Sequence, residues 1–598
     1  MTTPDYLDRA LTPEQRTADL LPRMTLEEKA GLLFHPQSEL PSSVGFSVER
    51  ADEVARGDVS GKRISHFNIL NGTSAVEVAA WTNRLQEWAA DTRLGIPITF
   101  SSDPRNGYRS TPFTGQSIDE LSKWPEPTGL GAIGDPDRAQ EFGDTVRREF
   151  LAMGIRVYLG PMADLYTEPR WSRGFGTFGE DVRVVSELTR AFIAGLRGGP
   201  ALGAGSVAAV LKHFPGGGPQ KDGNDAVDSR FPDQVYPGGR QELHLQPFVD
   251  AIADGVTQVM TYYGRPLGTD WEEVGFAFNA PVVRDLLRGR LGYRGIVMSD
   301  WNVVGTATIE GTTFGPNAYG VEDLTIEERL ARAITNGIDQ FGGDTLTEEL
   351  TRVVRDGLVP EDRIDASVER LLLEKFRLGL FENRFVDLDH ARAVGSDPDL
   401  AAKGVRAQTD AMVFLGGERP GTLPLPALTR VYAEGVDLSR TEHDFVPVDA
   451  PADADVALVQ LDSPWQSDPG SPLGDYFRTG SLEFPGETVA HLRELAERLP
   501  VVLFVYLERP AVLTALAPTA AAIVGHFGAS DQVIVDAVAG GAPFTATLPF
   551  DLPRSMAAVE ASREDVPFDT ADPLFLAGDG SVPYADAAVA LSGTEPGE

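Results

Sequence analysis

The chain has 598 residues, more than one typical domain, and its 42% hydrophobic and 24% charged content is ordinary for a globular protein with sizeable cores. Its formal net charge of -37, from 89 acidic and 52 basic residues, would repel nucleic-acid backbones and anionic membrane surfaces. The sequence contains no cysteine, which excludes disulfides, thiolate metal ligands and cysteine nucleophiles. We therefore expect two large domains that bind neither nucleic acid nor membrane.

The first residues of the chain carry neither the basic segment nor the apolar segment of a secretion signal. No stretch of the sequence is long and apolar enough to suggest a membrane-spanning helix. The default expectation is therefore a cytoplasmic protein. A homo-oligomer is compatible with the sequence, which does not specify the oligomeric state.

Short apolar runs recur along the first 345 residues, and most of them end in polar side chains. They cover residues 96–100, 155–159, 207–211, 256–260 and 338–341. Amphipathic helical stretches lie between them, for example 138–151 and 325–334, the second of which opens with a capping box from Thr325 to Glu328. This alternation predicts a parallel sheet, and its length favours a (β/α)8 TIM-like barrel over an open doubly wound sheet.

The most informative run is 292–301, in which an apolar strand ends at Asp300 and is followed by Trp301. A carboxylate at the end of a buried strand must be stabilised by donors or cations, and an adjacent indole suits the apolar face of a sugar ring. The alternative interpretation is that Asp300 caps the next helix and Trp301 fills a gap in the core.

Side chains at the carboxyl ends of barrel strands converge on one mouth of the barrel, where barrel enzymes place their chemistry. The strand ends predicted here bring together Asp103, Lys212, His213, Met260, Tyr263, Asp300 and Trp301. Each residue alone also has a structural interpretation, because a strand-end lysine is often exposed and a lone histidine or methionine often belongs to the core. The prediction of a site rests on their convergence.

A second α/β pattern follows the barrel, which we expect to close with an amphipathic helix over 362–380. Its predicted strands are 412–415, 456–459, 501–505 and 522–524, with a helix over 487–498. These elements predict an α/β three-layer sandwich with a parallel sheet. The predicted boundaries are a barrel over 1–385, a linker over 386–400, a sandwich over 401–591 and a disordered tail over 592–598.

Three motifs together resemble those of glycoside hydrolase family 3. They are Lys212-His213-Phe214-Pro215-Gly216-Gly217-Gly218, Pro169-Arg170-Trp171-Ser172-Arg173 followed by Phe178-Gly179-Glu180-Asp181, and Ser299-Asp300-Trp301. The similarity extends from Met24-Thr25-Leu26-Glu27-Glu28-Lys29 to Gly528-Ala529-Ser530, which is nearly the whole chain. Each motif alone is of moderate specificity, whereas their order along the chain is highly specific.

The resemblance implies a retaining, exo-acting β-glycosidase whose active site lies where the barrel meets the sandwich. Asp300 matches the position of the catalytic nucleophile. The positions that match the lining of the first sugar subsite are Asp103, Arg173, Lys212, His213, Met260, Tyr263 and Trp301. Physical chemistry is consistent with these roles, because positive charge from Lys212 or Arg173 would lower the pKa of Asp300, and cationic donors bind sugar hydroxyls.

The resemblance also bears on the general acid. Some members of the family use a histidine at the position of Gly217, so the glucosidase-like branch, which takes its acid from a second-domain loop, is the better match. Relatives carry a glutamate in that loop where this chain has Gln466, and glutamine cannot titrate. Asp462, Asp475 and Glu483 are further carboxyl groups in this region, but we predict that Asp468 serves as the acid.

The resulting expectation is an enzyme that hydrolyses terminal, non-reducing β-D-glucosyl or related residues from oligosaccharides or glycosides. β-Xylosidase or arabinosidase activity is a close alternative, because a pentose differs mainly by lacking the hydroxymethyl arm. A sugar-binding homologue without turnover is the alternative from another class, because Gln466 replaces an acid. The eight histidines show no metal-ligand spacing, so neither a metal nor another cofactor is expected.

Overall fold

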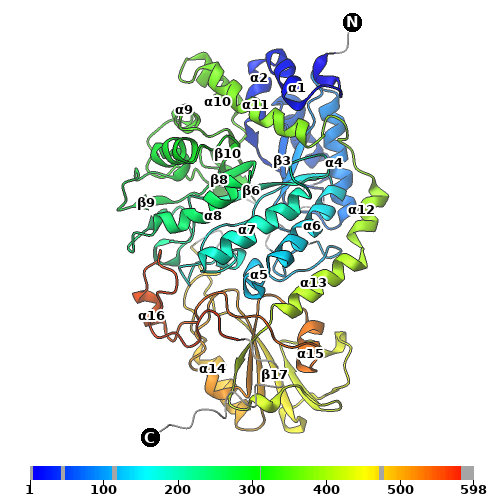
Figure 1. Ribbon diagram of the computed structural model, residues 1–598, viewed down its shortest axis with the longest axis vertical. Coiled ribbons are helices and arrows are strands. Elements are labelled where there is room, and N and C mark those ends of the chain that lie inside the picture. Colours follow the sequence, from blue (N-terminus) through cyan, green and yellow to red (C-terminus); the bar gives the residue numbers. More distant parts are fainter. Residues whose placement is uncertain are drawn as a thin grey trace.

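The computed structural model describes residues 4–41, 47–110, 118–309, 312–470, 474 and 477–580. Two α/β units lie one above the other in Figure 1, a larger one coloured blue to green and a smaller one coloured yellow to orange. The larger unit is the barrel expected from the sequence, and the smaller one is the sandwich.

The barrel is a closed sheet in which every neighbouring pair of strands is parallel. Its strands are β1 (Phe34–His35), β2 (Gln37–Ser38), β3 (His66–Ile69), β4 (Thr99–Ser102), β5 (Ile155–Tyr158), β6 (Ala208–Phe214), β8 (Gln258–Thr261), β10 (Ile296–Trp301) and β13 (Gln340–Gly342). The predictions of a parallel sheet and a barrel are therefore confirmed.

Closure of the barrel depends on a short segment that crosses from one end of the sheet to the other. β1 pairs with β13, whereas β2 pairs with β3. Pro36 separates the two pieces and has no N–H, but its carbonyl accepts a hydrogen bond of 2.8 Å from Asn68 N. β1 and β2 together therefore serve as one of eight strand positions, which the sequence analysis did not identify.

Helices surround the barrel. They are α1 (Pro13–Leu20), α2 (Leu26–Leu32), α3 (Val48–Arg56), α4 (Ala75–Ala90), α5 (Pro127–Ile133), α6 (Pro136–Ala152), α7 (Val182–Arg197), α8 (Gln241–Ala253), the π-helical segment η7 (Pro281–Arg290), α9 (Ile326–Asn336), α10 (Thr347–Arg355) and α11 (Glu361–Arg377). The capping box of α9 is confirmed: Thr325 Oγ1 accepts from Glu328 N at 3.2 Å, and Thr325 N donates to Glu328 Oε2 at 2.8 Å.

The second unit contains a six-stranded sheet in the order β14-β19-β18-β17-β15-β16. Its strands are β14 (Val413–Gly416), β15 (Arg430–Glu434), β16 (Val446–Pro447), β17 (Val456–Asp462), β18 (Val501–Tyr506) and β19 (Ala522–His526). All pairs are parallel except β14 with β19, which is antiparallel. The sheet is therefore mixed, and not purely parallel as predicted.

The two faces of this sheet carry separate apolar cores, as the period of two in a strand requires. Leu503 on β18 packs with α14 (Gly486–Ala496), whereas its neighbour Phe504 packs with α15 (Asp531–Val538) on the opposite face. Helix, sheet and helix form three layers, which confirms the predicted sandwich.

The region predicted as a linker contains helix α12 (Leu388–Gly395) and the start of α13 (Pro398–Asp410). The two helices descend from the barrel to the sandwich in Figure 1. Val394 and Leu400 form a small cluster with Ala152 of the barrel helix α6. The connection is therefore packed against the barrel. The predicted tail, 592–598, lies outside the described residues.

The chain returns to the barrel after the sandwich sheet. Beyond α16 (Met556–Ala561), the carboxylate of Asp565 accepts hydrogen bonds from the barrel amides of Gly238 at 2.6 Å and Arg240 at 2.7 Å. Thr547 N also donates to Ala132 O at 3.1 Å. These contacts fix the sandwich over the mouth of the barrel.

Candidate active site

A pocket of about 790 Å³, open solvent at its mouth included, lies at the carboxyl ends of the barrel strands. Its described lining residues include seven of the nine nominated by the sequence: Asp103, Arg173, Lys212, Met260, Tyr263, Asp300 and Trp301. They come from β4, β6, β8 and β10 and from the loop before η4 (Gly174–Gly176). The eighth, His213, lies behind Arg173 and within 4.0 Å of Asp300.

Asp300, the residue before the end of β10, has a buried carboxylate that is held on one side only. Its Oδ1 accepts a hydrogen bond of 2.8 Å from Trp301 N, and the hydroxyl of Tyr263 also bonds this carboxylate. Oδ2 is buried and has no hydrogen-bond partner among the described residues, with His213 Nε2 at 4.0 Å. One carboxylate oxygen is therefore positioned and unused, as a nucleophile requires.

Burial raises the pKa of Asp300 to about 6, and the positive charges of Arg173 and Lys212 only partly offset this effect. The sequence analysis expected the two cations to lower this pKa. They do so, but desolvation in the pocket is the larger effect. Asp300 is therefore mostly ionised at neutral pH, because its pKa of about 6 lies only slightly below neutral pH.

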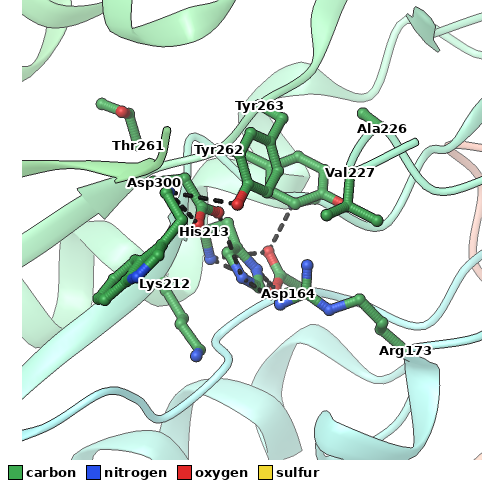
Figure 2. A network of polar contacts seen from close by, with 12 residues as sticks. Asp164, Arg173, Lys212, His213, Ala226, Val227, Thr261, Tyr262, Tyr263 and Asp300 are labelled. Carbon is green, nitrogen blue, oxygen red and sulfur yellow. Dashed lines mark hydrogen bonds and ion pairs between the residues drawn. The ribbon is translucent and has the colours of Figure 1, made fainter. Parts of the chain in front are cut away.

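His213 is held in one tautomer by its neighbours (Figure 2). Its Nδ1 lies 2.9 Å from Asp164 Oδ2, and its Nε2 lies 2.7 Å from Arg173 Nη2. Because a carboxylate only accepts and a guanidinium only donates, Nδ1 carries the proton and Nε2 accepts. Burial and the two neighbouring cations hold the pKa of His213 far below its ordinary value, so this imidazole is neutral and positions Arg173.

The opposite wall of the pocket carries a buried ion pair. Lys212 Nζ lies 2.9 Å from Asp103 Oδ1, and Asn68 Nδ2 donates to Asp103 Oδ2 at 3.4 Å. Both charged side chains are mostly buried yet line the pocket. A carboxylate and an ammonium in this arrangement can accept from and donate to neighbouring sugar hydroxyls.

Arg173 connects the two walls. Its Nη1 lies 3.9 Å from Asp225 Oδ2, and Asp225 itself accepts from Tyr262 at 2.7 Å and from Trp171 at 2.8 Å. The guanidinium also lies 5.9 Å from the ring centre of Phe477, in the second domain. Arg173 is thus fixed by charge and by packing before any substrate enters.

The pocket floor is apolar. Met260 belongs to a cluster in the barrel interior with Val157 and Met298, and Trp301 packs against this cluster while it lines the pocket. Met260 and Trp301 therefore belong to the core and also line the pocket, and their contact with a substrate stays a prediction. Their side chains fill the barrel and present a flat apolar surface to the pocket.

Sequence reasoning did not nominate several residues that line or support the pocket. They are Gln37, Asn68, Asp164, Asp225, Val227, Asn302, Phe314, Asn317 and Phe477. Gln37 and Asn68 were missed because β2 and β3 are short and are not continuous apolar runs. Asp164 follows a predicted strand, so its place at a strand end could have identified it as a site residue. Phe477 stands in a loop, and no local pattern specifies the conformation of that loop.

The structure does not bring Asp468 to this pocket. Its side chain is 36% exposed and forms an ion pair of 2.6 Å with Arg230, at a separate surface depression that it shares with Gln466. The hydrogen bond from Arg230 keeps the pKa of Asp468 below its ordinary value, whereas a general acid needs a raised pKa. The sequence-based choice of Asp468 therefore has no geometric support, and Asp475 lies outside the described residues.

The structure explains why position 217 is a glycine. Its N–H donates to Asp164 Oδ1 at 2.5 Å, and a Cβ at this position would lie 3.2 Å from the same oxygen. Any side chain here would press on the carboxylate that orients His213. This barrel loop therefore supports His213 and supplies no acid of its own.

Comparison with known proteins identifies the family. Residues 25–373 match the glycosyl hydrolase family 3 N terminal domain, which is more than half of the chain. The chain belongs to glycosyl hydrolase family 3. It is therefore a glycoside hydrolase, and the resemblance inferred from the three motifs is confirmed.

The family 3 hydrolase has full-length relatives. It is 42% identical to β-glucosidase C of Emericella nidulans, with 96% of this chain and 93% of the relative covered. It is also 36% identical to a periplasmic β-glucosidase/β-xylosidase of Dickeya chrysanthemi, with 96% and 91% covered. The alignments include both domains.

Solved structures share the fold. A β-glucosidase from Erythrobacter marinus superposes with a TM-score of 0.77 at 21% identity, covering 98% of this chain and 84% of that one. An exo-1,3/1,4-β-glucanase from a Pseudoalteromonas species gives a TM-score of 0.77 at 20% identity, covering 97% and 74%. These likenesses establish the two-domain architecture of the family 3 hydrolase.

The described part of the chain shows neither a membrane-spanning helix nor a cluster of metal ligands. None of its helices is both long and apolar enough to cross a bilayer. No group of three or more histidine, aspartate or glutamate side chains is arranged there to hold a metal ion.

Proposed function

We propose that this hydrolase removes single glucose units from the non-reducing ends of β-linked oligosaccharides or glycosides, with retention of configuration. The observation that carries the proposal is the buried carboxylate of Asp300, with one oxygen bonded by Trp301 N and the other unpaired and close to the pocket. An ionised carboxylate in this state can attack an anomeric carbon and form a covalent intermediate.

Binding of a single terminal sugar is supported by the shape and chemistry of the pocket. Asp103 and Lys212 on one wall and Arg173 on another offer acceptors and donors that are fixed in advance, while Trp301 offers a flat apolar face. Phe477, from the second domain, also lines the pocket. A sugar lacking one of the recognised hydroxyls would leave buried charged groups unpaired, which is strongly unfavourable.

Glucose is favoured as the glycone because the relatives with 41–42% identity are named β-glucosidases. The relative from Dickeya chrysanthemi is named for both glucosidase and xylosidase activity, so β-xylosidase activity is the second candidate. The general acid is proposed to come from the second-domain loop that contains Phe477, a described residue of the pocket lining. A cytoplasmic location remains a prediction, as do the oligomeric state and the lack of binding to nucleic acid.

Hydrolysis of 4-nitrophenyl β-D-glucoside, β-D-xyloside and α-L-arabinoside tests the proposal. We expect the glucoside to give the largest kcat/KM, and proton NMR of the first-formed sugar to show the β-anomer. An α-anomer as first product would contradict the retaining mechanism, and lack of turnover on all three glycosides would favour a sugar-binding protein.

A further inference from the structure

A second cavity adjoins the active-site pocket. It encloses about 1060 Å³, open solvent included, and shares five of its described lining residues with the first pocket: Asp103, Leu159, Arg173, Lys212 and Phe477. We call this second cavity the chamber. Because the Asp103–Lys212 pair borders both spaces, the chamber is continuous with the wall that would bind sugar hydroxyls.

The position of the chamber relative to Asp300 determines which end of a substrate could reach it. Asp300, Trp301 and Tyr263 line the first pocket but not the chamber. The anomeric carbon and its leaving group must lie next to Asp300 for the reaction to occur. The chamber therefore faces the hydroxyls on the far side of the sugar ring, and a group that occupied it would be attached to one of those oxygens.

Aromatic and other apolar side chains contribute much of the chamber lining, together with the charged residues Asp103, Arg109, Glu126, Arg173 and Lys212. Six of its described lining residues carry aromatic rings: Phe142, Tyr158, Phe175, Phe178, Phe192 and Phe477. Pro125, Pro127, Pro161 and Met162 add further apolar surface. Such a lining favours a flat apolar group over a second sugar, whose hydroxyls would need several polar partners.

Besides Asp103, the chamber is lined by a second buried carboxyl group, that of Glu126. Its two hydrogen bonds to described residues, from Arg109 N at 2.8 Å and Tyr506 at 3.3 Å, both go to Oε1. Burial raises the pKa of Glu126 to about 7, so a protonated fraction is present near neutral pH. Oε2 is then able to donate a hydrogen bond to a carbonyl group.

We propose that the chamber is a subsite for an aromatic acyl group esterified to the terminal sugar, on an oxygen that faces the Asp103–Lys212 pair. The proposal rests on the proposed glycosidase function and extends it to one substrate class, the acylated β-glucosides. The aromatic ring lies among the phenylalanines, and the ester carbonyl accepts from Glu126. The glycosidic bond alone is cleaved, so the product is an acylated sugar.

The test compares 4-nitrophenyl β-D-glucoside with its 6-O-benzoyl, 4-O-benzoyl and 6-O-xylosyl derivatives. We expect at least one benzoyl ester to be cleaved with a kcat/KM no less than one tenth of that of the unsubstituted glucoside. Losses of more than tenfold for both esters would overturn the proposal. Cleavage of the xylosyl derivative with rejection of both esters would also overturn it, because the chamber would then hold a sugar.

Variants locate the effect in the chamber. Met162→Trp places a large ring in the chamber and should lower kcat/KM at least tenfold for the accepted ester, with less than a threefold change for the unsubstituted glucoside. Met556→Trp, a half-buried methionine in a separate cluster, is the matched control and should affect neither substrate selectively. Equal losses on both substrates for Met162→Trp, in a folded protein, would contradict the assignment.

A second variant and a binding measurement complete the test. Phe175→Ala removes part of the aromatic lining. It should raise the KM of the ester at least fivefold and leave the KM of the glucoside within twofold of its native value. An unchanged KM for the ester would count against the chamber as the acyl subsite.

If the unsubstituted glucoside is not hydrolysed, the proposed function fails. The chamber is then judged by calorimetry, in which methyl 6-O- or 4-O-benzoyl-β-D-glucoside must bind more tightly than methyl β-D-glucoside.

Discussion

The amide of Trp301 donates a 2.8 Å hydrogen bond to Oδ1 of Asp300, and Oδ2 of the same carboxylate is left without a partner among the described residues. The bond is local, since it joins neighbours in the chain at the end of β10. It fixes the plane of the carboxylate without occupying the second oxygen. This asymmetry distinguishes Asp300 from Asp103, whose two oxygens contact Lys212 and Asn68.

Replacement of the nucleophile is the most direct test of this arrangement. Asp300→Asn should lower kcat on 4-nitrophenyl β-D-glucoside by roughly 1,000-fold or more, because an amide cannot form the glycosyl ester. Asp285→Asn is the control, since Asp285 is an exposed carboxylate on η7, away from the pocket. Turnover by the Asp300 variant close to that of the native protein would refute the assignment.

Activity should fall as the pH drops through the pKa of Asp300. Burial raises that pKa to about 6, so the carboxylate becomes protonated below this pH and loses its nucleophilicity. We expect the acidic limb of kcat/KM to have an apparent pKa near 6 rather than near the ordinary aspartate value. A limb centred at or below pH 4 would show that some other group controls it.

The same shift predicts the effect of Asp300→Asn on stability. A carboxyl group whose pKa is raised in the folded state contributes most stability at low pH, and this contribution is lost as the pH rises from the unfolded value to about 6. Asparagine does not titrate. The difference in Tm between variant and native protein should therefore shift in favour of the variant between about pH 4 and 6 and then level off, and a shift in the opposite direction would contradict the pKa assignment.

The hydroxyl of Tyr263 stabilises the ionised form of Asp300, since it bonds the carboxylate and also accepts from Trp301 N at 3.2 Å. Tyr263→Phe should lower kcat by roughly 10- to 100-fold, as expected for loss of one positioned donor. It should also move the acidic limb of the pH profile upward, which a merely structural change would not do. Tyr236→Phe removes a buried hydroxyl elsewhere in the barrel loops and should leave the limb in place.

Asp468 provides a test of the sequence-based choice of acid. Because its carboxylate is exposed and paired with Arg230, we expect Asp468→Ala to lower kcat/KM by less than about threefold on both 4-nitrophenyl β-D-glucoside and cellobiose. Arg230→Ala, which removes the same ion pair from the other side, should behave alike. A much larger loss for Asp468→Ala on cellobiose than on the nitrophenyl glucoside would restore its role as general acid.

Local sequence patterns were enough to predict a strand, and the site residues at its end, wherever the strand was long and apolar. The run that ends at Asp300 and the run that delivers Lys212 and His213 could be placed at the barrel mouth because parallel strands all end at the same face. The strand formed by β1 and β2 has no such run, since Pro36 divides it into two pieces that pair with different neighbours. Gln37 and Asn68 were therefore missed.

The sequence by itself determined the order of the two domains and the family, and it nominated Asp300 as the nucleophile, because periodicity and motifs are recorded in neighbouring residues. Only the tertiary structure decided which groups meet across the chain. It showed that Asp468 pairs with Arg230 outside the pocket, that Phe477 reaches the mouth, and that burial outweighs two cations at Asp300. Desolvation and the path of a loop depend on contacts between residues far apart in sequence, and no local pattern contains them.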